Sequence, residues 1–119
     1  MKCRIAPLAL LASGLPVAAL AHAFLDHAVP AVGSTVATAP QQIELFYTQQ
    51  LEPAFSGAEL SGPEGQVITT GPATIDPQNP MEMVLKVPAL APGHYKVRWH
   101  VLSVDTHRTE GGFGFDIRP

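Results

Sequence analysis

Cysteine is almost absent from this sequence. The only one, Cys3, lies at the very start of a chain of 119 residues. No internal disulfide can form, so the fold has to be held together by a hydrophobic core, which a chain near 100 residues can build. The length allows one such domain and no more.

Basic residues are also scarce, with seven Lys and Arg against ten Asp and Glu and a formal net charge of −3. No basic stripe exists, which argues against nucleic acid as a partner. The chain has no Gly-rich phosphate loop and no G-x-S-x-G elbow. Its downstream serines lack a sequence context for activation, although a catalytic triad assembled by the fold stays open.

Only one long apolar run is present, and it lies at the N-terminus. Lys2 and Arg4 precede an apolar segment from Leu8 to Leu20, and Ala19-Leu20-Ala21 is a small-x-small cleavage signal. We expect residues 1–21 to be a signal peptide and residues 22–119 to be the exported domain, with net charge −5 and no membrane insertion. A second signal, Ala21-His22-Ala23, leaves open a cut that would start the chain at Phe24.

The rest of the chain alternates short apolar runs with Pro and Gly. Period-2 patterns predict strands at residues 43–47, 83–87, 95–101 and 113–117. Turn signals separate them, at residues 30–34, 61–65, 76–80 and 91–93. Residues 62–79 are polar and rich in Pro and Gly, and we interpret them as a hairpin and a loop. No segment has the 3.6-residue period of a capped helix. Many short strands of this kind predict an antiparallel all-β sandwich or barrel.

His22 would become the first residue after cleavage behind Ala21. Its α-amine and imidazole could then chelate one metal ion, because an α-amine titrates roughly 2.5 pH units below a lysine amine and so loses its proton more easily at neutral pH. A chelate of two nitrogens favours Cu(II). A chance histidine at this position is the alternative.

Asp105-Thr106-His107 is a second candidate feature. On an extended strand, residues two apart point to the same face, so the carboxylate and the imidazole would form half of a site for a divalent metal. A solvated surface pair is the alternative. Together with an N-terminal His22, the pair would complete a plane of three nitrogens and one oxygen.

The segment from Gly93 to His107, GHYKVRWHVLSVDTH, followed by Gly111, Gly112 and Phe115, resembles the C-terminal signature of the CopC copper-resistance family. The start His22-Ala23-Phe24 and residues 30–34 resemble the mature N-terminus of that family, and residues 43–45 and 55–58 fit as well. The resemblance implies a Greek-key, immunoglobulin-like β-sandwich of about seven strands in the periplasm. It also implies one Cu(II) ion held by His22, Asp105 and His107, and a first cut after Ala21.

Three departures from the family pattern matter. Residues 61–80, where some members have a methionine-rich Cu(I) site, contain no Met; Met81 and Met83 follow, and Met83 fits a core position. Phe24 stands where some members have a further histidine, which leaves His27 as a candidate in another register. Gln49 stands where the family often has a glutamate; if that glutamate supports the site, the glutamine here weakens the support. We therefore expect a site for Cu(II) alone.

These observations favour a non-catalytic copper carrier or buffer that passes Cu(II) to an inner-membrane transporter of the CopD type. Two rival functions remain: a copper monooxygenase of the histidine-brace type, and an immunoglobulin-like interaction module whose histidines are incidental. His94 and His100 are expected to be surface or packing residues, and Tyr95 and Trp99 to fill the core.

Overall fold

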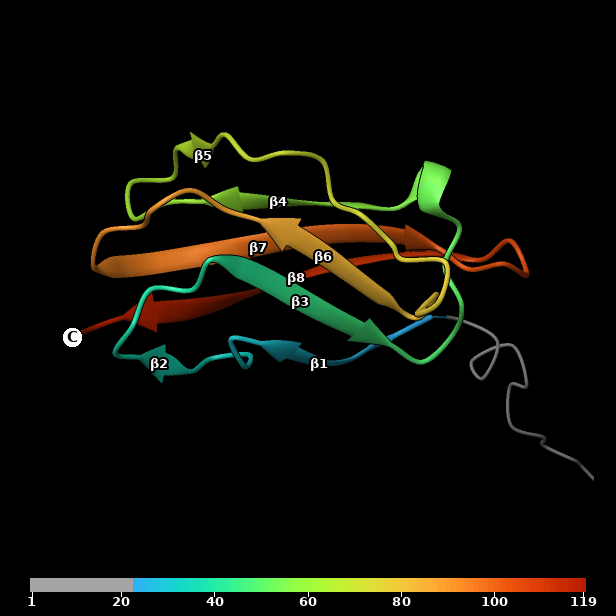
Figure 1. Ribbon diagram of the computed structural model, residues 1–119, viewed down its shortest axis with the longest axis horizontal. Helices are drawn as coiled ribbons and strands as arrows, with labels where there is room; N and C mark the ends of the chain where they lie inside the picture. The colour runs from blue at the N-terminus through green and yellow to red at the C-terminus, as the bar shows by residue number, and fades with distance from the viewer. Residues whose placement is uncertain (1–22) are drawn as a thin grey trace, which may run out of the picture.

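The computed structural model describes residues 23–119, which form two sheets packed face to face (Figure 1). The smaller sheet has three strands in the order β1-β3-β6, and the larger has five in the order β2-β8-β7-β4-β5. In chain order the elements are β1 Leu25–Val29, β2 Thr35–Val36, β3 Gln42–Tyr47, a 3-10 turn η1 Pro53–Phe55, β4 Gly57–Ser61, β5 Val67–Ile68, β6 Glu82–Lys86, β7 Gly93–Leu102 and β8 Arg108–Ile117. The expected all-β sandwich is confirmed.

The long antiparallel pair β7–β8 is the central element of the larger sheet. Ten consecutive residues of β7 pair with ten of β8, from Gly93 opposite Ile117 to Leu102 opposite Arg108. β4 pairs along the other side of β7, while β2 runs parallel to the end of β8. The turn at one end of this pair is therefore carried by the most extensively hydrogen-bonded strands of the sandwich.

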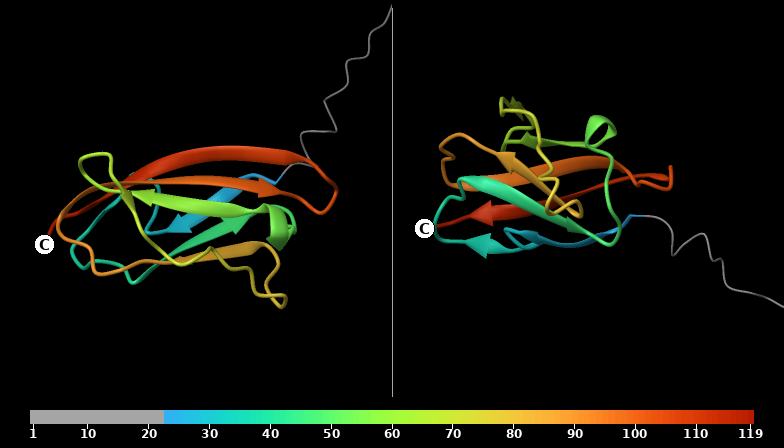
Figure 2. Two further views of the ribbon diagram at one scale, coloured as in Figure 1. Left: turned by 90° about the horizontal axis from the view of Figure 1, so that it is seen from above. Right: turned by 45° about the vertical axis from the view of Figure 1, so that its right-hand side comes forward.

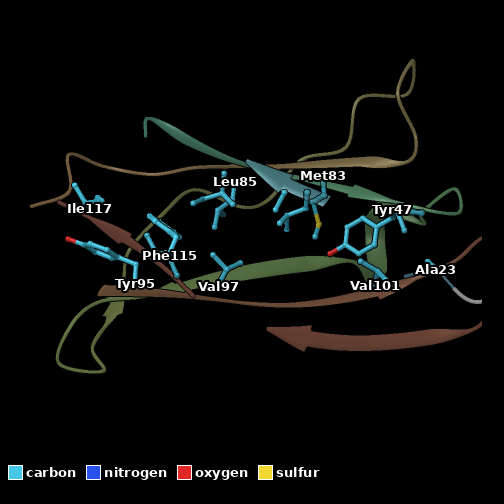
Figure 3. Packing of buried hydrophobic residues seen from close by; sticks show 14 residues of the cluster. Ala23, Tyr47, Met83, Leu85, Tyr95, Val97, Val101, Phe115 and Ile117 are labelled. Atoms are coloured by element: carbon cyan, nitrogen blue, oxygen red, sulfur yellow. The ribbon is translucent and has the colours of Figure 1, made fainter. Parts of the chain in front are cut away.

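The strands predicted from alternation are all present, and their inward residues are buried. The inward side chains of β3 lie beside those of β6 on one face of the smaller sheet, with Ile43 next to Leu85 and Leu45 next to Met83. That face packs against the inward side chains of the larger sheet, which are Tyr95, Val97, Val101, Phe115 and Ile117. Figure 3 shows these side chains filling the space between the sheets, with Ala23 beside Val101 and Tyr47 at one end. The predicted core role of Met83 is confirmed, because its side chain is fully buried.

The interpretation of residues 62–79 as a hairpin and a loop is confirmed for the turn, the second strand and the loop, whereas the first strand of the hairpin, β4, lies before residue 62. β4 and β5 pair around a turn closed by the amide of Gly65, which donates to the carbonyl of Gly62, and the following loop is tied to β6 by a bridge between Thr74 and Val84. The shortest strands, β2 and β5, have two residues each and no alternation for a sequence pattern to show. Within residues 23–119, no helix is long and apolar enough to cross a membrane.

Candidate metal site

Asp105 and His107 lie in the turn between β7 and β8, and not on an extended strand as the sequence analysis assumed. The turn is closed by the amide of Thr106, which donates to the carbonyl of Ser103 at 2.8 Å, and by the amide of Ser103, which donates to the carbonyl of His107 at 2.9 Å. Thr106 has a positive φ of 71°. A chain that reverses within five residues needs such a left-handed position, which a count of two residues along a strand does not foresee.

The turn nevertheless brings the two side chains together. Nδ1 of His107 lies 3.3 Å from Oδ1 of Asp105, and the side chains are 43% and 40% exposed. A carboxylate and an imidazole at this distance, open to solvent on one side, are two donors of the kind that Cu(II) accepts. Within residues 23–119 no group of three or more His, Cys, Asp or Glu side chains is placed to hold a metal ion.

Ser103 supports this pair from the core side of the turn. Its hydroxyl donates to Oδ1 of Asp105 and accepts from the amide of His107 at 3.2 Å. The hydrogen bond from Ser103 is the main reason why the pKa of Asp105 lies below its ordinary value, and the hydrogen bond and charge of His107 act in the same direction, against partial desolvation. At neutral pH the carboxylate is therefore ionised and ready to bind a cation.

The start of the described chain is held at the same end of the sandwich. The carbonyl of Ala23 accepts a hydrogen bond of 2.7 Å from Oγ1 of Thr109, the second residue of β8. The backbone of Phe24 exchanges two hydrogen bonds of 3.0 Å with Thr48, one of them to its hydroxyl. Both views in Figure 2 place the beginning of the blue segment beside the turn between β7 and β8. His22 lies outside the described residues.

A third segment, residues 50–52, completes this end. The amide of Val104 donates to the carbonyl of Gln50 at 3.0 Å, and the amide of Glu52 donates to the carbonyl of Leu102 at 2.8 Å. Gln49 immediately precedes this segment. Three parts of the chain that are distant in sequence therefore converge on the turn that holds Asp105 and His107.

The comparisons with known proteins agree with the fold described above. The family model of the CopC domain matches residues 25–118. This chain belongs to the CopC family. It is 40% identical over 99 residues to Protein YobA of Escherichia coli K12, covering 82% of this chain and 80% of that protein. It is 38% identical over 118 residues to Copper resistance protein C of Pseudomonas syringae pv. tomato, covering 92% of both.

Among solved structures, the crystal structure of CopC from Methylosinus trichosporium OB3b superposes with a TM-score of 0.78 at 34% identity, over 82% of this chain and 95% of that one. The resemblance seen in the sequence is thus confirmed, and membership supports copper binding and copper resistance as the role of this CopC family member.

Among residues 23–119, the other three histidines of this CopC family member, His27, His94 and His100, lie apart from the pair. His94 and His100 are exposed on the outer face of β7, as expected; His94 pairs with Asp116 at 2.6 Å, and the His100 ring lies over Gly57. His27 pairs with Asp26 at 2.7 Å and its ring is stacked on Phe46, with centroids 4.3 Å apart. That stacking directs His27 along the outer face of the smaller sheet.

Ser103, Thr109 and Thr48 are the residues of this site that sequence reasoning missed. The serines of the sequence suggest only a nucleophile, for which Ser103 has no activating context. Its place two residues before Asp105, where serine often closes a turn through its hydroxyl, is the signal that could have found it. Thr109 and Thr48 act through backbone groups of residues 23 and 24, and no local pattern links such distant positions.

Proposed function

We propose that this protein is a periplasmic carrier of a single Cu(II) ion. The ion would be bound by the α-amine and imidazole of His22, by the carboxylate of Asp105 and by the imidazole of His107. The observation that carries the proposal is the hydrogen bond between Ala23 and Thr109. Consecutive Cα atoms are about 3.8 Å apart, so residue 22 starts one such step from an anchor that is two residues beyond His107.

The burial of Ala23 supports a cut after Ala21 over a cut after Ala23. Ala23 is fully buried, and its carbonyl is the acceptor for Thr109. A chain that began at Phe24 would lose both the packing and the hydrogen bond. A chain that began at His22 would keep them and present a new amine beside the turn.

The donor set supports Cu(II) over Cu(I). Imidazole, amine and carboxylate suit Cu(II), whereas thiolate and thioether ligands select Cu(I). Residues 61–80 contain no methionine, Met83 is sealed in the core, and Met81 is a single half-exposed thioether. We propose that the protein acts without catalysis, and that protonation or reduction of the ion releases it.

We further propose that the acceptor is an inner-membrane copper transporter of the CopD type. The rim of the candidate site supports contact with a partner, because Phe24 and Val104, which lie on two of the converging segments, are 46% and 47% exposed. Exposed apolar side chains beside a transfer site are suited to docking.

The test is a Cu(II) titration of the chain 22–119 against a competing chelator. We expect one equivalent to bind, with affinity falling steeply below about pH 6 as the donors take up protons. His107→Gln should weaken binding by more than about a hundredfold, a larger loss than changes outside the ligand shell cause. The matched control is His94→Gln, which removes the imidazole of another His–Asp pair and should change affinity by less than about threefold.

A glycine added ahead of His22 should also weaken binding sharply, because the amine moves out of the chelate ring. Copper held equally well by the extended chain, or by His107→Gln, would overturn the proposed site.

A further inference from the structure

Ser103 is the one fully buried polar side chain among residues 23–119. A buried hydroxyl is costly unless it is hydrogen-bonded, so its contacts are expected to matter. The hydroxyl donates to Oδ1 of Asp105, accepts from the amide of His107 at 3.2 Å and lies 3.2 Å from the carbonyl of His107. One buried atom therefore contacts both residues of the candidate pair.

The contacts also determine how the carboxylate is presented. The hydroxyl of Ser103 and Nδ1 of His107 both face Oδ1 of Asp105. Oδ2 is thus the oxygen that remains for an incoming cation. The Nδ1 atom of His107 is buried, while 43% of the side chain is exposed, so the ring reaches solvent by its other edge.

Ser103 is held by hydrogen bonds to its neighbours on several sides. Its neighbour Leu102 is the last residue of β7, paired with Arg108, and a bridge links Ser103 to Leu51. The backbone of Ser103 also closes the turn in both directions, to Thr106 and to His107. The backbone of Ser103 is thus held by the strands and the turn, and its hydroxyl contacts the two half-exposed residues Asp105 and His107.

We propose that Ser103 is the positioning residue of the copper site, which orients Asp105 and His107 before the ion arrives. The inference rests on the proposed function above. Groups that orient metal ligands reduce the ordering cost of binding, and their loss typically weakens affinity about tenfold to a hundredfold.

The test compares Ser103→Ala, Ser103→Thr and Ser56→Ala in the chain 22–119. Ser56 is the matched control, because its hydroxyl accepts from the amide of Leu102 at 3.1 Å and contacts neither donor. Cu(II) affinity is measured by chelator competition, and the coordination sphere by electron paramagnetic resonance. A general loss of stability would not alter the resonance spectrum of the folded, copper-loaded protein.

We expect Ser103→Ala to weaken Cu(II) binding about tenfold to a hundredfold and to shift or broaden the copper hyperfine lines. Ser103→Thr, which retains the hydroxyl, should restore the spectrum and most of the affinity. Ser56→Ala should match the unmodified chain in both. An unchanged spectrum and affinity in Ser103→Ala, or equal losses in Ser56→Ala, would overturn the proposal.

A measurement without copper separates this inference from the proposed function. Amide hydrogen exchange of His107 should become faster in Ser103→Ala, because the amide loses its acceptor, and should stay slow in Ser56→Ala. Unchanged exchange at His107 contradicts the positioning role even if copper binds as proposed. A Cu(II) affinity that is unchanged in His107→Gln contradicts the proposed function, whatever the hydrogen exchange shows.

Discussion

The phenol ring of Tyr47 meets the indole of Trp99 edge to face, with centroids 5.2 Å apart and ring planes at 75°. Tyr47 is buried, its hydroxyl has no hydrogen-bond partner among residues 23–119, and burial raises the pKa of this phenol far above its ordinary value. The ring thus contributes packing between the two sheets, while the hydroxyl contributes only its desolvation cost.

Tyr47→Phe should therefore stabilise the metal-free protein by about 1 kcal/mol, since it removes a buried hydroxyl that no described residue satisfies and keeps the ring contact. Tyr95→Phe is the matched control: the hydroxyl of Tyr95 donates to the carbonyl of Ala91 at 2.5 Å, so its loss should destabilise by about 1 kcal/mol. Urea unfolding measures both. Destabilisation of similar size in the two variants would refute the argument.

Gly111 lies beside the indole of Trp99, and its lack of a side chain leaves room for that ring. A Cβ at Gly111 would come within 2.7 Å of the Trp99 ring. Gly111→Ala should therefore displace the indole, cost about 1–3 kcal/mol and shift the fluorescence maximum of the single tryptophan. Gly71→Ala, at a position with nothing within 4 Å, should stay within about 0.5 kcal/mol. An unchanged emission maximum in Gly111→Ala would show that the indole is not displaced and would contradict the prediction.

Thr106 holds the left-handed position of the turn with a β-branched side chain, at φ 71°. Asparagine tolerates this conformation much better than threonine does. We expect Thr106→Asn to raise the free energy of unfolding of the metal-free protein by about 1 kcal/mol, and Thr106→Val, which keeps the branch, to lower it or leave it unchanged. Thermal unfolding of the two variants gives the comparison, and equal midpoints would contradict the expected strain.

Asp105 should make the stability of the metal-free protein depend on pH. Its pKa is lower in the folded state than in the unfolded chain, where it is near ~3.9, so the ionised form stabilises the fold above that value. The contribution is lost as the pH falls through the lower, folded-state pKa. Asp105→Asn should thus be less stable than the unmodified chain at pH 6, and the difference should disappear in stronger acid. A difference that persists unchanged below pH 2 would require another cause.

The fold was predictable from sequence where a strand buries every second residue; β4, in which only Leu60 is buried, shows no such pattern and was not predicted. In β3, β6, β7 and β8, burial of every second residue leaves a period of two in the side chains, and that period was visible. β2 and β5 pair over two residues each, which is too short for any period. β1 contains a bulge between Leu25 and His27, so its alternation is interrupted.

The site was predictable only in part. The pairing of Asp105 with His107 was expected, but for the wrong geometric reason, since a turn and not a strand brings them together. The support by Ser103 depends on a hydroxyl that is buried by the packing of distant segments. Local sequence carries the identity of such a residue, whereas its burial and its hydrogen-bond partners follow from the assembled sandwich.

The last strand, β8, leads the chain away from the turn, so that the C-terminus lies at the opposite end of the sandwich from Asp105 and His107 (Figure 1). A reporter protein, a surface-coupling tag or a membrane tether joined behind Pro119 would therefore project away from the proposed copper site. The same fusion partner joined directly ahead of Ala23 would lie close to the proposed copper site. Fusions for imaging or immobilisation should accordingly be built at the C-terminus, where they leave the proposed site open to the ion and to the proposed acceptor.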